Sequence, residues 1–170
     1  MVERLAHVDH VVSTASARAR GQVADLDPTV VNLSFGTKVV GPILLAKHFG
    51  PPLAKDGSFV LLSGSTAVKP TVGMLAVGAT NAAVNAVART LAVELAPIRV
   101  NAVSPGVIES GAYDALGEQQ KAALFAARSE HHPAGRIGHP DDIASAVVFA
   151  LTSTFLTGNV LNVDGGEPLV

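Results

Sequence analysis

Four short apolar runs separated by longer helix-type segments are the feature that most constrains how this 170-residue chain can fold. Each run is rich in Val, Ile or Leu, and they lie at residues 7–13, 58–63, 98–104 and 159–163. Between them, helix-type patterns occur at residues 28–49, 74–96, 113–130 and 140–151. Strands that alternate with helices are joined by right-handed parallel crossovers. The sequence therefore predicts an α/β fold with an open parallel sheet of about four strands and flanking helices.

Local signals mark where these helices begin and end. Asp27 followed by Pro28 is typical of an N-cap with proline at the first helical position. The Gly-Pro-Pro sequence at 50–52 predicts the end of that helix. The His-Pro-Asp-Asp sequence at 139–142 predicts the capped start of the last helix.

Composition excludes several classes of protein. Hydrophobic residues make up 48% of the chain and charged residues 15%, which excludes a disordered protein. The net charge is −2 and no Lys/Arg stripe occurs, so no nucleic-acid partner is expected. Cysteine is absent, and no stretch of about 18 uncharged apolar residues indicates a membrane span. Without a signal-type run near Met1, we expect a single cytoplasmic domain over residues 1–170.

Metal and hydrolase chemistry are also not indicated. The six histidines show no spacing with Asp or Glu that suits a metal ion, so no metal site is expected. No serine lies in the G-x-S-x-G context of a nucleophile elbow.

Two long segments carry a family resemblance. LAVELAPIRVNAVSPGVIES (91–110) and the C-terminal sequence from GRIGHPDDIASAVVFALT to LNVDGG (135–166) resemble the short-chain dehydrogenase/reductase family. DHVVSTAS (9–16) resembles the strand and turn that end in Asn-Asn-Ala-Gly in the family, and GSFVLLSGS (57–65) resembles the strand that carries its catalytic serine. The resemblance covers nearly the whole chain. It implies a Rossmann-like sheet made of family strands 4-5-6-7, and an NAD- or NADP-dependent oxidoreductase.

The family's phosphate-binding turn has no counterpart in these residues. In the family, three strands and a Gly-rich turn precede the segment that resembles 9–16. That turn needs closely spaced glycines because the backbone must approach a pyrophosphate at a helix N-terminus. The chain has 16 glycines, but none forms a G-x-G sequence. We therefore expect a domain truncated at its N-terminus, which binds its cofactor weakly or not at all.

All four catalytic positions implied by the resemblance are changed. The family uses Asn, Ser, Tyr and Lys, and the Tyr and Lys lie four residues apart on one helix face. Val77 stands at the Tyr position and Asn81 at the Lys position. Lys38 stands at the Asn position, and Gly64 stands at the Ser position between two serines.

The exchange of residue types between positions 38 and 81 retains one ammonium and one amide. One hypothesis makes Lys38 a relocated acid/base or a substrate-anchoring cation, with Ser63 and Asn81 beside it as the other catalytic candidates. The alternative is an inert lysine whose stem lies along a helix face.

A second set of residues corresponds to the cofactor side of the family's site. These candidates are Ala15 in the turn after the first strand, and Ser104, Pro105, Gly106, Val107, Ile108 and Ser110 after the third. By resemblance, residues 104–108 pack against the nicotinamide. The alternative is that Pro105 and Gly106 only end the strand.

Two functions remain open from the sequence. One is a weak or inactive relative of NAD(P)-dependent oxidoreductases that acts on a small-molecule substrate. The other is a pseudoenzyme that acts through small-ligand binding or homo-oligomeric assembly. By resemblance, helices 28–49 and 74–96 would form the interface of a dimer or tetramer. The second of these helices is rich in alanine, which allows close helix packing.

Overall fold

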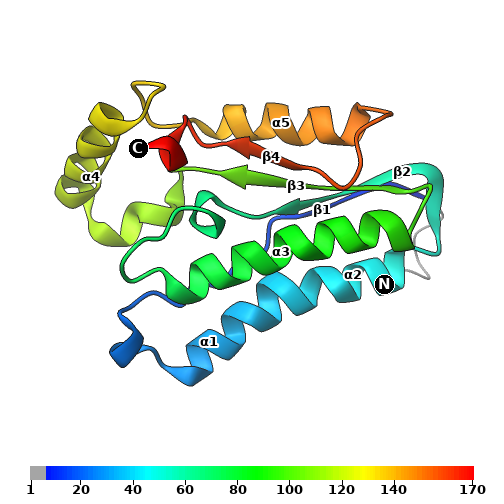
Figure 1. Ribbon diagram of the computed structural model, residues 1–170, viewed down its shortest axis with the longest axis horizontal. Coiled ribbons are helices and arrows are strands. Elements are labelled where there is room, and N and C mark those ends of the chain that lie inside the picture. Colours follow the sequence, from blue (N-terminus) through cyan, green and yellow to red (C-terminus); the bar gives the residue numbers. More distant parts are fainter. Residues whose placement is uncertain (1–6) are drawn as a thin grey trace.

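Four parallel strands form one sheet in the order β1-β2-β3-β4 (Figure 1). The computed structural model describes residues 7–170. The strands are β1 (Val8–Ser13), β2 (Leu53–Leu62), β3 (Arg99–Pro105) and β4 (Val160–Val163). All three neighbouring pairs are parallel. The predicted Rossmann-like α/β fold is confirmed, and so is the spatial order of its strands.

The second strand begins earlier than predicted. Its register with β1 breaks between Val8, which pairs with Leu53, and His10, which pairs with Ser58. Leu53 is buried, which holds the chain against β1 before the predicted start at residue 58. Gly57 lies in the break, where a Cβ atom would come within 2.7 Å of the Ala54 carbonyl oxygen. A glycine permits this close approach, and its turn-like appearance in the sequence concealed the longer strand.

The predicted helix over residues 28–49 contains a π-helical turn. It consists of α1 (Pro28–Phe35), the π turn η3 (Gly36–Val40) and α2 (Gly41–Phe49). The wider turn is closed by a bond from the Gly41 N–H to the Gly36 carbonyl oxygen. The predicted N-cap is present, because Asp27 accepts a 2.7 Å hydrogen bond from the Thr29 N–H. Lys38 lies inside the π turn, a deviation often found at functional sites.

Helices cover both faces of the sheet (Figure 1). On one face lie α1, α2 and α3 (Leu75–Glu94), and on the other lies α5 (Pro140–Thr152). Helix α4 (Glu118–His131) lies at one end of the sheet, near the C-terminus of the chain. Short 3-10 turns complete the connections: η2 (Val23–Asp25), η4 (Ser65–Ala67), η5 (Gly111–Leu116) and η6 (Glu167–Leu169).

Two cores form because successive strand residues face opposite sides of the sheet. Phe59 points toward α2 and α3, where it packs with Val84 and Ala88. Its neighbour Val60 joins Val103 and Ala150 beneath α5. Leu53 and Leu61 belong to the larger of the two clusters, with Phe59. The central strands β2 and β3 are therefore buried on both faces, whereas Val12 on the edge strand β1 is 41% exposed.

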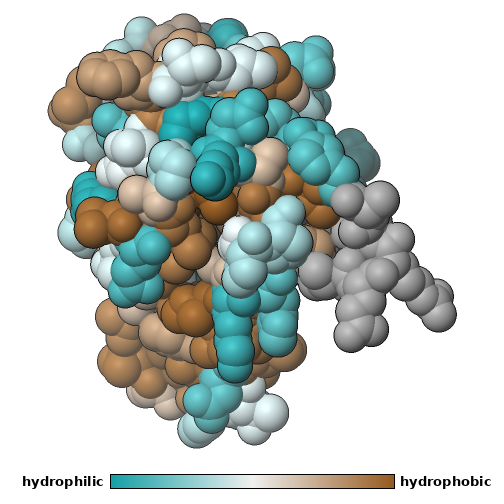
Figure 2. Space-filling view, turned by 90° about the vertical axis from the view of Figure 1, so that its right-hand side faces the viewer, coloured by the Kyte–Doolittle hydropathy of each residue, from teal (hydrophilic) through white to brown (hydrophobic). Residues whose placement is uncertain are grey.

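The helical run Pro28–Phe49 is apolar on more than its sheet-facing side. By length and composition alone it could cross a membrane, with a mean hydropathy of 1.4 in its most apolar window. In this fold it packs on α3, and core helices of globular proteins have the same length and composition. Figure 2 shows hydrophobic surface over the lower part of its view, where this helical layer lies, interrupted by hydrophilic side chains.

Candidate active site at the carboxyl edge of the sheet

A cavity of about 440 Å³ lies at the carboxyl ends of the strands. Its walls come from residues that follow β1, β2, β3 and β4, together with the π turn η3, the first half of α3 and the inner side of α4. In open parallel sheets, ligands bind at this edge, because the loops that carry side chains converge there.

Lys38 enters the cavity from the π turn. Its side chain is buried, with only 7% of the residue exposed. Its Nζ donates a 3.1 Å hydrogen bond to the Ser63 carbonyl oxygen at the end of β2. Burial and, as the smaller cause, the charge of the Arg18 guanidinium together lower the pKa of Lys38 from 10.5 to about 8. The lysine is therefore an internal cation close to its titration range at neutral pH, and it does not lie along the helix surface.

Ser63 and Asn81 are joined to Lys38 through a continuous set of hydrogen bonds. The Ser63 Oγ donates to the Asn81 carbonyl oxygen at 3.0 Å. The Asn81 Nδ2 donates to the Thr66 Oγ1 at 2.7 Å. The three residues predicted as catalytic thus lie together and line the same cavity. However, Ser63 holds Lys38 through its backbone carbonyl, whereas its hydroxyl is directed to α3.

The glycine at the family's serine position is coupled to Asn81. A Cβ atom on Gly64 would lie 2.6 Å from the Asn81 Nδ2. The amide therefore fills the space that a side chain at position 64 would need. The Asn81 Oδ1 is buried and accepts no hydrogen bond from residues 7–170. Among these residues it is an unpaired acceptor, on a residue that lines the cavity.

Two further residues, neither with a predicted catalytic role, line the cavity from different elements. Val77 lines it from α3, at the family's tyrosine position, and has no proton to transfer. Tyr113, the only tyrosine of the chain, lines it from η5. Burial raises the pKa of Tyr113 against the opposing effect of Arg18 and Arg20. Its ring stacks edge-on against Phe125 at 5.5 Å and lies 5.8 Å from the Arg20 guanidinium carbon. A neutral hydroxyl is therefore kept in this wall.

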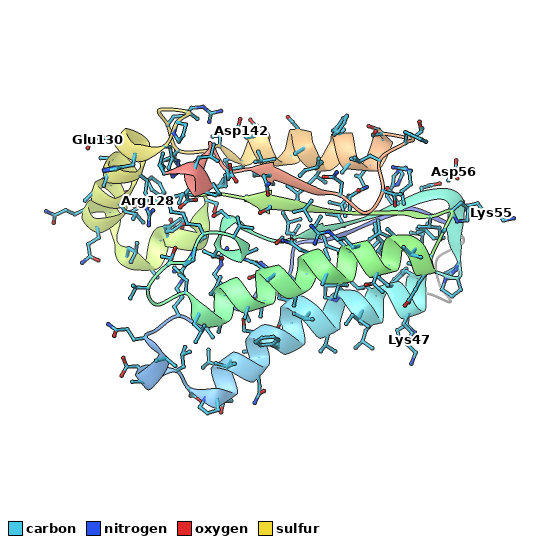
Figure 3. All side chains as sticks on the ribbon, viewed as in Figure 1. Lys47, Lys55, Asp56, Arg128, Glu130 and Asp142 are labelled. Atoms are coloured by element: carbon cyan, nitrogen blue, oxygen red, sulfur yellow. The ribbon has the colours of Figure 1, made fainter. Side chains whose placement is uncertain are left out.

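Cationic side chains dominate the charged lining. Among the described residues that line the cavity, the charged ones are Arg18, Arg20, Lys38, Arg128 and Glu167. Arg128 points from α4 toward the C-terminal segment, whereas Glu130 lies on the outer side of that helix (Figure 3).

Glu167 is the single carboxylate in this wall, and it is held in place. It accepts hydrogen bonds from the Ser65 Oγ at 3.0 Å and from the Arg128 Nη1 at 3.4 Å. Lys69 anchors the same turn by donating to the carbonyl oxygens of Glu167 and Val170, each at 2.8 Å. The C-terminal turn η6 is thus attached to the site.

The predicted cofactor-side residues divide into two groups. Pro105, Gly106, Val107, Ile108 and Ser110 line the cavity. Ser104 is buried within the sheet, where it pairs with Asn162 and does not line the cavity. Ala15 is exposed and also does not line it, although Thr14 and Ser16 on either side do.

Gly106 determines the course of the loop after β3. A Cβ atom there would lie 2.8 Å from the Asp164 carbonyl oxygen, so the loop packs closely on the segment after β4. Pro105 and Gly106 therefore end the strand and also shape the cavity wall.

Sequence reasoning missed Arg18, Arg20, Tyr113, Arg128 and Glu167. The arginines looked like ordinary loop and helix-surface residues, and Glu167 follows the last strand. Only Tyr113 carried a signal, since it is the one tyrosine in the chain. Within residues 7–170, no group of three His, Asp or Glu side chains could hold a metal ion.

Comparison with known proteins identifies the family to which this site belongs. The family model described as "Enoyl-(Acyl carrier protein) reductase" matches residues 1–167. The short-chain dehydrogenase/reductase ucsE of an Acremonium species is 35% identical over 166 residues, which cover 94% of this chain and 62% of that protein. The chain belongs to the short-chain dehydrogenase/reductase family.

Other members of the short-chain dehydrogenase/reductase family extend the comparison. Tropinone reductase-like 3 of Erythroxylum coca is 30% identical over 98% of this chain and 66% of its own length. A crystal structure described as a small-chain dehydrogenase in complex with NADPH is 38% identical, with a TM-score of 0.95 over 99% of this chain and 77% of that chain. The chain thus spans a little under two thirds of the length of these curated relatives.

Proposed function

We propose that this protein is an NAD(P)-dependent oxidoreductase in which Lys38 takes over the proton transfer of the family's tyrosine. The observation that carries the proposal is the burial of the Lys38 ammonium in the cavity, held by the Ser63 carbonyl oxygen. A general acid works best when its pKa lies near the operating pH, and the pKa of Lys38 is lowered to about 8.

The residues present fit the nicotinamide side of such a cofactor. The buried Asn81 Oδ1 has no donor among residues 7–170 and could accept a hydrogen bond from a ribose hydroxyl. The loop at 105–108 lines the cavity beside it, where the family resemblance expects the nicotinamide. A related structure, described as a small-chain dehydrogenase, contains NADPH. When bound, the nicotinamide ring supplies a hydride to the substrate or accepts one from it.

Lys38 provides the matching proton. In the direction of reduction, its ammonium donates a proton to the substrate oxygen as that oxygen gains an electron pair. The neutral amine then regains a proton from water. The same position serves a ketone or a double bond conjugated to a carbonyl, because negative charge develops on oxygen in both cases. The names of the relatives include the 1-cyclohexenylcarbonyl-CoA reductase of Streptomyces collinus, which is 32% identical over 176 residues.

Ser63 acts as a positioning residue in this scheme. Its carbonyl oxygen orients the Lys38 ammonium, and its hydroxyl is fixed by the Asn81 carbonyl oxygen. Such a pre-oriented donor needs little rearrangement during the reaction.

A non-catalytic relative is the competing function, and the observation that favours it is Val77 at the tyrosine position. Calorimetric titration with NADPH and NADH, followed by assays of nicotinamide oxidation with ketones and unsaturated thioesters, separates the two. Because residues 1–170 lack the family's phosphate-binding turn, we expect weak cofactor binding with measurable turnover. Lys38→Met should lose at least about 100-fold in kcat, and Lys47→Met, on the exposed side of α2, should show no change. Binding without turnover, or equal rates for both variants, would favour the non-catalytic protein.

A further inference from the structure

Two of the three arginines that line the cavity, Arg18 and Arg20, form no ion pair with a carboxylate anywhere in residues 7–170 that would account for their presence. The chain as a whole has a net charge of −2, yet four of the five charged side chains that line the cavity are cationic among the described residues. Like charges gathered in one cleft repel each other and raise the local concentration of anions.

Glu167 does not neutralise this excess. Both of its carboxylate oxygens are engaged, one by the Ser65 hydroxyl and the other by Arg128. Arg128 is therefore the partly compensated cation of the group. Arg18 and Arg20 are left with their guanidinium donors available to a ligand.

The two uncompensated arginines lie around the part of the cavity where chemistry is proposed. The Arg18 charge acts on both Lys38 and Tyr113. Arg20 lies against the Tyr113 ring. An anion bound between them would lie close to the Lys38 ammonium and beside the neutral Tyr113 hydroxyl, which can donate a further hydrogen bond.

We infer that the cavity binds a substrate that carries an oxyanion group near its reacting oxygen, with Arg18 and Arg20 as the residues that hold it. Guanidinium groups bind carboxylates and phosphates through paired, charge-assisted hydrogen bonds. The assignment of this anion to a substrate rests on the proposed oxidoreductase function. The existence of an anion site does not rest on that function, because anion binding can be measured without turnover.

The single tyrosine supplies a reporter at the site, since the chain contains one tyrosine and no tryptophan. Tyrosine emission is recorded while the protein is titrated with malonate, with inorganic phosphate and with neutral dimethyl malonate. We expect saturable changes with at least one of the anions, none with the diester, and weaker binding as salt is added. Arg18→Gln and Arg20→Gln should each weaken binding about tenfold or more, the usual scale for a charge-assisted hydrogen bond.

Matched controls give each outcome a meaning. Arg89→Gln, on the exposed side of α3 and outside the cavity, should bind as the unmodified protein does. Equal binding of malonate and its diester would overturn the inference. So would Arg18 and Arg20 variants that bind the anion as tightly as the unmodified protein does. The anion that binds more tightly, malonate or phosphate, indicates whether the substrate carries a carboxylate or a phosphate group.

Competition with the cofactor distinguishes the two sources of an anion. If the arginines hold the substrate, saturating NADPH should leave the affinity for the anion unchanged or increased. Displacement of the anion by NADPH would assign the arginines to the cofactor's phosphates and overturn the inference. Anion binding without any NADPH binding would retain the anion site but remove the proposed oxidoreductase function, so the two can fail separately.

Discussion

Lys38 illustrates how one side chain can oppose stability and support function. An ammonium in a buried position loses hydration, which lowers its pKa and raises the free energy of the folded state. One hydrogen bond to the Ser63 carbonyl oxygen offsets part of this cost. The neighbouring Arg18 adds repulsion. Such an arrangement is more often found at functional sites than in structural cores.

The first prediction concerns stability. The folded-state pKa of Lys38, about 8, lies below the ordinary value of 10.5, so the unfolded chain binds more protons between these pH values. Stability should therefore rise with pH from about 8 to about 10.5. At pH 7, Lys38→Met should increase the free energy of unfolding by up to ~3 kcal/mol, at 1.36 kcal/mol per pKa unit. Urea unfolding across this pH range measures the free energy of unfolding of both proteins. The difference between the variant and the unmodified protein should become smaller at high pH.

The second prediction concerns the interaction between Lys38 and Arg18. Because Arg18 lowers the pKa of Lys38, Arg18→Gln should raise that pKa above about 8. Reduction needs the protonated amine, so kcat at saturating substrate should fall as pH rises through the Lys38 pKa, and at a higher pH in the variant. NMR titration of methylated Lys38 compares its pKa in the two proteins without an activity assay. An identical titration in both proteins would contradict the placement of Arg18.

At the scale of elements, the sequence predicted what depends on periodicity and missed what depends on packing. The helices and strands were recognised because their apolar spacing is regular. The early start of β2 and the π turn at Gly36–Val40 were not, since Leu53 and Lys38 reveal their roles only once tertiary contacts exist. The same limit applies to the site: Lys38, Ser63 and Asn81 were found by position, whereas Arg18 and Arg20 reach the cavity through a loop.

The third prediction tests the capped start of α5. Asp142 accepts the His139 N–H at 2.7 Å and binds Arg136 through both oxygens, which holds the pKa of its carboxyl below the usual range. Asp142→Asn should lower the melting temperature at neutral pH. A depressed carboxyl pKa contributes stability above the unfolded pKa and loses it as pH falls through the folded value. The two proteins should therefore converge in acid. Asp141→Asn, at a more exposed carboxylate, is the control.

At the scale of the whole molecule, two surfaces have no partner among residues 7–170. Strand β1 pairs only with β2 among the described residues, so its other edge is free to bond. The α1–α2 layer exposes several large aliphatic side chains: Val30, Leu33, Val40, Ile43 and Leu44. Apolar residues gathered on one helical face are typical of a surface that another protein chain covers.

The last prediction follows from that helical face. We expect it to join two copies of the chain, as the family resemblance of these helices implies. Leu33 is 60% exposed on α1, and Leu33→Asp would place a charge in the contact. The variant should lower the mass measured by sedimentation, from a dimer to a monomer or from a tetramer to a dimer. Val72, which is 86% exposed in the loop before α3, provides the matched control Val72→Asp. Because both substitutions replace an exposed aliphatic side chain, a general loss of solubility would affect both variants, whereas the loss of an interface affects only the first. A monomeric unmodified protein at high concentration would contradict the expectation and leave the apolar face to another partner.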